Sequence, residues 1–155
     1  MVGDLRRRLD PNAAAGVPAH ITALYPFRPS EAVTPEVVET LEALFRKTSP
    51  FELSVGSTAR FPGVLWLRPE PRGPIDALTR ALTQAFPDCL PYGGRFADPV
   101  PHLTVAIHGN EGVLNRAEAR LRRRLTRPFT ARIETCALFV QSGERWGEWR
   151  RFRLG

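Results

Sequence analysis

The sequence predicts an α+β fold built from two similar lobes. The expected elements follow the order strand, helix, two strands, helix, and then strand, helix, two strands, so the second half resembles the first. Each half opens with a strand that carries a histidine and a threonine two residues apart, the first at His20 and the second at His102. A length of 155 residues, 43% of them hydrophobic, suits one domain with a core. We therefore expect a single bilobal domain over residues 18–155, with an antiparallel sheet and helices in each of two pseudo-symmetric lobes, preceded by a loose arm over residues 1–17.

Amphipathic periodicity predicts three helices. Thr34 followed by Pro35 is a typical helix start, and apolar residues recur on one stripe over residues 35–48. The same spacing predicts helices over residues 74–86 and 111–125. Each of them has one apolar face to pack against the rest of the domain.

The other apolar segments predict strands, because they are rich in β-branched and aromatic residues and are bounded by Pro and Gly. Gly56 is expected to mark a bulge or bend in its strand, and a later strand is expected to bend near Cys136. The predicted strands are 19–25, 51–61, 63–69, 101–107, 129–141 and 146–155.

The chain is basic, with 22 Lys and Arg residues against 16 Asp and Glu residues and a formal net charge of +6. Lys47 is its only lysine, so arginine supplies nearly all of the positive charge. This balance favours anionic partners such as phosphates and RNA, and it says nothing of the fold.

Cysteine usage and hydropathy indicate a compartment. Cys89 and Cys136 form no CxxC motif, which indicates two free thiols in a reducing environment. The first residues lack the apolar stretch of a signal peptide, and no segment is long and apolar enough for a membrane span. We therefore expect a cytoplasmic monomer with no membrane partner.

The two histidine–threonine pairs share a geometry. Side chains at positions i and i+2 of a strand point the same way, so His20 and Thr22 share one side, as do His102 and Thr104. One such motif is common by chance, but two at matching positions predict a site where two imidazoles and two hydroxyls converge. The third histidine, His108, is expected in a surface loop. The residues that alternate with the motif residues are apolar and are expected to face the core: Ile21, Ala23, Leu103 and Val105.

Such a set of side chains suits phosphodiester chemistry without a metal or another cofactor. A neutral imidazole can take a proton from the attacking oxygen, while a protonated imidazole gives one to the leaving oxygen. Threonine hydroxyls can donate hydrogen bonds to the non-bridging phosphate oxygens. No group of His, Cys, Asp and Glu has the spacing of metal ligands, so we expect no metal site.

These motifs resemble those of the 2H phosphoesterase superfamily, in its 2′-5′ RNA ligase-like (LigT-like) branch. "HITALYPF" at residues 20–27 is similar to the first motif of that branch, and "PHLTVA" at residues 101–106 matches the second. "YGGRF" before the second motif and the terminal "FRLG" are also typical of the family. The resemblance implies a bilobal α+β fold with a positively lined cleft between the lobes.

The resemblance also implies an activity. It implies metal-independent cleavage of 2′,3′-cyclic phosphates or 2′-5′ phosphodiester linkages, in RNA or nucleotides as the partner. The residues that carry over as the catalytic set are His20, Thr22, His102 and Thr104.

Further residues near the motifs are expected to bind substrate. Tyr25 and Phe27, directly after the first motif, could stack on a base or pack beneath the site. The loop over residues 87–100 could close over the site and clamp phosphate or base, or it could be a mere connection. The expected substrate-binding residues are Tyr25, Phe27, Tyr92, Arg95 and Phe96.

Three alternatives stay open, one of which is a regulatory or partner-binding protein that merely retains the site. The chain could be an RNA- or nucleotide-binding module without turnover, a hypothesis that rests on its arginines and aromatic residues. Binding alone does not need two histidines on matching strands, which argues against this alternative. The chain could also hydrolyse a small cyclic-phosphate metabolite such as ADP-ribose cyclic phosphate, because the walls of the site would decide the substrate.

Overall fold

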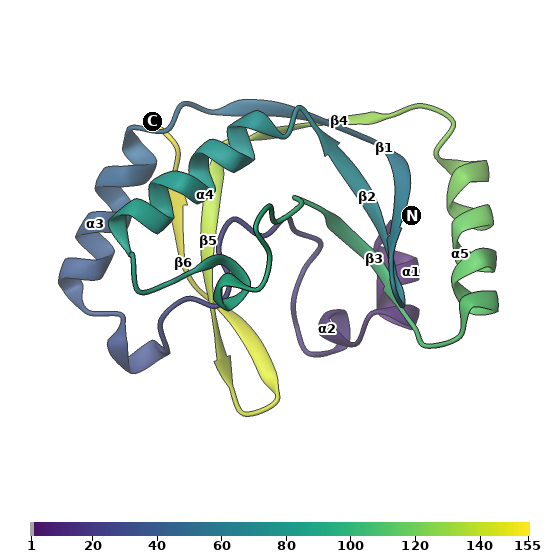
Figure 1. The fold of residues 1–155 in the computed structure, drawn as a ribbon, viewed down its shortest axis with the longest axis horizontal. Coiled ribbons are helices and arrows are strands. Elements are labelled where there is room, and N and C mark those ends of the chain that lie inside the picture. Colours follow the sequence, from purple (N-terminus) through teal and green to yellow (C-terminus); the bar gives the residue numbers. More distant parts are fainter. Residues whose placement is uncertain (1) are drawn as a thin grey trace.

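The computed structural model describes residues 2–155 and contains two antiparallel sheets (Figure 1). The strands are β1 (Phe51–Phe61), β2 (Val64–Glu70), β3 (Leu103–Ile107), β4 (Phe129–Ile133), β5 (Thr135–Ser142) and β6 (Arg145–Arg153). The helices are α1 (Val2–Leu9), α2 (Pro11–Ala14), α3 (Pro35–Arg46), α4 (Gly73–Ala85) and α5 (Glu111–Arg124), with short 3-10 turns η1 (Ser30–Ala32) and η2 (Pro91–Gly94). One sheet has the order β3-β2-β1-β4, and the other consists of β5 and β6. The predicted α+β class with antiparallel sheets is confirmed, and the two sheets are unequal in size.

The predicted helices are present at the expected places. α3 begins at Pro35, directly after Thr34, and α4 and α5 occupy the segments predicted for them. The predicted stripe of α4 is buried at Ile75, Leu78 and Leu82. Amphipathic spacing located these helices because one face of each packs into a hydrophobic core.

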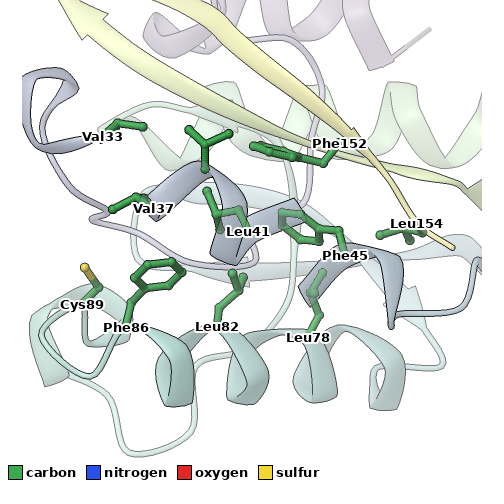
Figure 2. Close-up of a cluster of buried hydrophobic side chains, with 11 residues drawn as sticks. Val33, Val37, Leu41, Phe45, Leu78, Leu82, Phe86, Cys89, Phe152 and Leu154 are labelled. Atoms are coloured by element: carbon green, nitrogen blue, oxygen red, sulfur yellow. The ribbon is translucent and has the colours of Figure 1, made fainter. Parts of the chain in front are cut away.

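One hydrophobic cluster joins α3, α4 and the end of β6 (Figure 2). The ring of Phe45 on α3 lies 5.2 Å, centroid to centroid, from the ring of Phe152 on β6. Leu78 and Leu82 face α3 from the turns of α4. Burying each of these side chains contributes about 1.5–3 kcal/mol, so this cluster holds the two helices against the two-stranded sheet.

A second cluster lies on one face of the four-stranded sheet, between that face and the helices α1 and α5. Leu65 and Leu67 of β2 and Val105 of β3 are fully buried in it, together with Leu114 of α5. Residues that alternate with them, such as Thr104, point to the other face. One face of this sheet is therefore core, and the other is available for a site.

The two predicted irregularities in the strands have clear positions. The pairing of β1 with β2 shifts register between Val55 and Ser57, which confirms the bulge predicted at Gly56. The segment over residues 129–141 is divided at Glu134, where β4 of one sheet ends and β5 of the other begins. The predicted bend near Cys136 is thus a change of sheet two residues earlier.

The predicted loose arm over residues 1–17 is wrong. Val2, Leu5 and Leu9 lie on one side of α1, where Leu5 is 6% exposed and the other two pack against the second cluster. The helix lies against β3 (Figure 1). The apolar spacing i, i+3, i+7 was present in the sequence, but the many charges of this segment concealed it.

The predicted strand over residues 19–25 is also wrong. This segment has no ladder partner in either sheet, and the structure assigns it no regular secondary structure. Its carbonyl groups are bound in other ways: that of Ala23 accepts from Thr79 Oγ1 at 2.7 Å, and that of Tyr25 accepts from the Tyr92 amide at 2.5 Å. A β-forming composition does not make a strand where no neighbouring strand supplies the hydrogen bonds.

Candidate active site

The second histidine–threonine motif lies on β3, at the edge of the four-stranded sheet. Leu103 and Val105 point into the second cluster, as the sequence predicts. Thr104 points to the opposite face, where it lies across from Trp66 of β2 in the strand pairing. His102 directly precedes the strand and its ring also contacts Trp66, so His102 and Thr104 lie on the same face.

His102 is enclosed by aromatic rings. Its imidazole meets Phe61 edge to face at a centroid distance of 5.2 Å, and meets Trp66 at 5.9 Å. Phe61 and Trp66 themselves stack at 4.8 Å. These edge-to-face contacts restrict the orientation of the His102 ring.

The two histidines are held in the same way. His20 Nδ1 lies 2.9 Å from the carbonyl oxygen of Pro18, and His102 Nδ1 lies 2.8 Å from that of Val100. A carbonyl oxygen can only accept, so Nδ1 must carry the hydrogen in each ring. The Nε2 atom of each ring is therefore left to accept a proton when the ring is neutral, or to donate one when it is charged.

The surroundings of His20 disfavour its charged form. His20 keeps contact with solvent, but enough protein surrounds the ring that desolvation lowers its pKa below the ordinary value of 6.5. The hydrogen bond to Pro18 opposes this change, and of the nearby charges Arg6 and His102 lower the pKa while Asp10 raises it. The charge of His102 is thus one of the influences on the pKa of His20.

A cavity with a volume of about 550 Å³ lies beside Thr22. Tyr25, Tyr92 and Phe96 line it, as do polar residues of α4 such as Thr79 and Gln84. The Thr22 hydroxyl is a hydrogen-bond partner of the Tyr92 phenol, whose pKa is raised by burial and lowered again in part by this bond. The loop before the second motif is thus tied directly to the first motif.

Three aromatic side chains of this lining form a row, which Trp146 extends outside the cavity. The ring of Tyr92 lies 6.4 Å from that of Tyr25 and 5.7 Å from that of Phe96. Trp146, near the start of β6, lies 6.3 Å from Tyr25 on its other side. Tyr25 and Phe96 are 48% and 58% exposed, so the row offers open ring faces to a ligand.

The structure does not bring all predicted site residues together. Phe27 packs edge to face on Phe86 in the first cluster, at 5.1 Å, and does not line the cavity. Arg95 is exposed and also lies outside the cavity lining. His20, His102 and Thr104 are not among the lining residues either, so the cavity adjoins the motif residues only at Thr22.

Sequence reasoning missed several neighbours of the histidines. Phe61 and Trp66 reach His102 through strand pairing, which no local pattern revealed. Arg6 and Asp10 act on His20 from a segment that we expected to be loose. The combination of an arginine and an aspartate four residues apart, just before a proline, was the signal that could have found them.

No group of His, Cys, Asp and Glu within residues 2–155 is arranged to hold a metal ion. Over the same residues, every helix is too short or too polar to cross a membrane. Both cysteines are free thiols, as predicted.

Comparison with known proteins identifies the family to which this fold and these motifs belong. A model of the 2′-5′ RNA ligase superfamily matches residues 2–145. Relatives from Bacillus cytotoxicus and Bacillus pumilus, each named "Putative phosphoesterase", are 34% identical over 105 residues and 35% identical over 104 residues. These matches cover 66% and 65% of this chain but 58% of each relative, so the chain spans less than two thirds of their length.

Solved structures share the fold at low sequence identity. TT0787 of Thermus thermophilus matches with a TM-score of 0.62 and 20% identity, over 89% of this chain and 80% of that chain. LigT of E. coli complexed with 3′-AMP matches with a TM-score of 0.57 and 20% identity, over 98% of this chain and 92% of that chain. The fold is thus that of the LigT-like proteins. With two histidine–threonine motifs and a family match over most of its length, the chain belongs to the 2′-5′ RNA ligase superfamily of 2H phosphoesterases.

Proposed function

We propose that this protein is a metal-independent phosphodiesterase that acts on 2′,3′-cyclic phosphates or 2′-5′ phosphodiester linkages of RNA or nucleotides. One observation carries the proposal. Two imidazoles, each bound through Nδ1 to the carbonyl two residues before it, interact electrostatically and leave both Nε2 atoms free for proton transfer. Acid–base cleavage of a phosphodiester needs two such groups, one to accept a proton and one to donate a proton.

The two histidines take opposite roles. His20, whose lowered pKa favours the neutral ring, accepts a proton from water through Nε2 while the water oxygen attacks phosphorus. His102, beside aromatic rings, donates its Nε2 proton to the ribose oxygen as the bond between that oxygen and phosphorus breaks. The product is a phosphomonoester, and His20 ends with a proton while His102 has lost one. A solvent proton exchange then restores both rings.

Thr22 and Thr104 hold the phosphate in this scheme. Each hydroxyl donates a hydrogen bond to a non-bridging phosphate oxygen, where negative charge gathers in the transition state. Thr104 shares a face with His102, and Thr22 lies at the edge of the cavity. The two hydroxyls would therefore bind the phosphate between the histidines and the cavity.

The cavity is the proposed site for the nucleoside part of the substrate. Its volume of about 550 Å³ lies within the range of roughly 300–1,000 Å³ found for small-molecule sites. The exposed rings of Tyr25 and Phe96 offer surfaces on which a base can stack, while Phe27 and Arg95 lie elsewhere. Structures of E. coli LigT with 3′-AMP, ATP and NADP+ support a nucleotide as ligand of this fold.

The test is hydrolysis of 2′,3′-cyclic nucleotides and of a short RNA that ends in a 2′,3′-cyclic phosphate, in the presence of EDTA. The variants are His20→Ala and His102→Ala. His108→Ala is the matched control, because His108 is exposed and its ring accepts a hydrogen bond from the nearby Asn110 amide. We expect EDTA-resistant turnover that falls by about 10²–10⁴-fold in each site variant and is unchanged in the control.

Other outcomes would redirect the proposal. Turnover that survives either site substitution contradicts the two-histidine mechanism. Binding of a cyclic nucleotide without turnover favours the binding-module alternative, and turnover of ADP-ribose cyclic phosphate alone favours a small-metabolite hydrolase.

A further inference from the structure

A buried ion pair lies next to the first motif. Arg6 of α1 and Asp10, which precedes α2, are each 3% exposed. Arg6 Nε donates to Asp10 Oδ2 at 2.9 Å, and Arg6 Nη2 lies 2.8 Å from the same oxygen. Nη2 has no well-oriented hydrogen-bond acceptor among the described residues. The pair is thus buried without being fully satisfied.

Stability alone is a poor reason for such a pair. The desolvation cost of two buried charges offsets most of their attraction, and apolar replacements are often equally stable. The other ion pair of α1, between Arg7 and Asp4, lies on the exposed side of the helix, so burial singles out Arg6 and Asp10.

Three hydrogen bonds, joined by short stretches of backbone, lead from this pair to His20. The second oxygen of Asp10, Oδ1, accepts from the Asn12 amide at 3.0 Å and so caps α2. The Asn12 carbonyl accepts from the Val17 amide at 2.9 Å. The next residue, Pro18, supplies the carbonyl that binds His20 Nδ1 at 2.9 Å.

This series matters because the segment that carries His20 belongs to no sheet. A strand residue is positioned by its ladder, whereas His20 lies outside both sheets and follows the short structure that α1 and α2 form. Arg6 also lines a second cavity together with Val17 and Pro18, so Arg6 lies near the residue whose carbonyl binds the imidazole.

We propose that the buried Arg6–Asp10 pair is the positioning device of His20, fixing the orientation of its imidazole and setting the charge around it. The proposal goes beyond the proposed function and rests on it only for the role of His20 as proton acceptor. The charged groups that act on the ring are Arg6 of α1, Asp10 immediately before α2 and His102 immediately before β3. Arg6 lowers the pKa of His20 and Asp10 raises it, so removal of either residue leaves the effect of the other uncompensated.

The experiment is an NMR titration of the histidine ring protons, which needs no substrate. Three histidines give three sets of signals, assigned with His20→Gln, His102→Gln and His108→Gln variants. Arg6→Met removes a positive charge and raises the titration midpoint of His20, whereas Asp10→Asn removes a negative charge and lowers it. We expect changes on the order of half a pH unit in each direction, the size of a Coulomb interaction in a partly solvated site.

Two further readouts separate positioning from mere folding. The ¹⁵N shifts of His20 should show hydrogen on Nδ1 in the unchanged protein and a mixture of tautomers in Arg6→Met. Arg7→Met, which removes the exposed neighbouring charge on the same helix, should leave the His20 midpoint and tautomer unchanged. If Arg6→Met does not fold, Asp10→Asn, which keeps the shape of the side chain, decides alone through the predicted fall of the midpoint.

The proposal is overturned if the His20 midpoint stays fixed in both variants, moves the same way in both, or responds equally to Arg7→Met. Because the titration is independent of turnover, an enzyme that cleaves no phosphodiester could still show the opposite shifts. Failure of the proposed function and failure of this inference are therefore distinguishable.

Discussion

His102 and Phe61 meet edge to face, with ring centroids 5.2 Å apart and ring planes at 90°. The contact joins the second motif to β1 across the intervening strand β2, since Phe61 stacks in turn on Trp66. A pairing of this kind restricts the imidazole to one orientation while its Nδ1 is bound by Val100. The Nε2 atom is thereby aimed in a fixed direction.

Replacement of Phe61 by leucine should therefore damage catalysis more than stability. We expect Phe61→Leu to lower kcat on a 2′,3′-cyclic nucleotide by about tenfold or more, because a catalytic group that is misplaced by about 1 Å loses much of its effect. The loss of an aromatic pair should cost about 1 kcal/mol of unfolding free energy. Steady-state kinetics and thermal unfolding measure the two effects.

Phe51 provides the matched control on the same strand. It is half-buried at the other end of β1, where it packs against the first cluster and not against a histidine. Phe51→Leu should lower stability by a similar amount and leave kcat unchanged. An equal loss of kcat in both variants would show that Phe61 acts through folding alone.

The lowered pKa of His20 predicts a pH dependence of stability. The folded protein binds a proton at His20 less readily than the unfolded chain, whose histidine titrates at its ordinary value of 6.5. Above that pH His20 is neutral in both the folded and the unfolded protein, so it does not change the free energy of unfolding. As the pH falls through 6.5, the unfolded chain takes up the proton first, so stability is lost.

His20→Gln should remove this acid sensitivity. The difference in Tm between the variant and the unchanged protein should move in favour of the variant as the pH falls from about 7.5 to about 5.5. His108→Gln serves as the control for the loss of a histidine elsewhere in the chain. A constant difference across this range would mean that folding leaves the proton affinity of His20 unchanged.

The sequence revealed those parts of the fold that depend on local periodicity. Ile75, Leu78 and Leu82 share one face of any helix formed there, and all three are buried. Residues 19–25 could not be placed in the same way, because a strand needs a neighbour and the sequence does not show whether one is present. α1 was hidden by its arginines, although Leu5 anchors it in the second cluster.

The candidate site was likewise predictable only where it depends on local sequence. Both motifs were visible because each lies within one short segment, whereas Phe61 and Trp66 reach His102 from distant parts of the chain through strand register. Phe27 packs on Phe86, which is also distant in the sequence, and so it does not line the cavity. Local motifs therefore predict the candidate reacting residues, and long-range packing decides what surrounds them.

The loop before the second motif contains three consecutive residues in the left-handed region: Tyr92, Gly93 and Gly94, with φ of 51°, 64° and 75°. A Cβ at Gly93 would meet no atom within 4 Å, so the effect of a substitution is purely conformational. Gly93→Ala should cost about 1 kcal/mol in this loop and displace Tyr92 from Thr22. We expect KM for a cyclic nucleotide to rise several-fold with kcat less affected.

Gly73 is the matched control, because a Cβ there also meets no atom within 4 Å and its φ is not positive. Gly73→Ala, at the start of α4, should leave KM unchanged. If Gly93→Ala binds substrate as well as the unchanged protein does, the loop plays no part in holding the ligand.

Gly56, at the bulge of β1, is required for a steric reason. A Cβ at this position would lie 2.7 Å from both Cβ and Cγ of Pro128, and 2.9 Å from its Cα. Pro128 directly precedes β4, which pairs with β1, so neither side can retreat without disturbing the sheet. Gly56→Ala should therefore lower the free energy of unfolding by about 1–3 kcal/mol, the usual cost of overpacking.

Gly147, in strand β6, tests whether the effect is steric. It is also a strand glycine, but a Cβ there would meet no atom within 4 Å. Gly147→Ala should change stability little in a urea unfolding experiment, while Gly56→Ala shifts the midpoint to lower urea. Restoration of stability by Pro128→Ala in the Gly56→Ala background would identify the proline ring as the source of the clash, and a persistent deficit would place the cost in the backbone of the bulge itself.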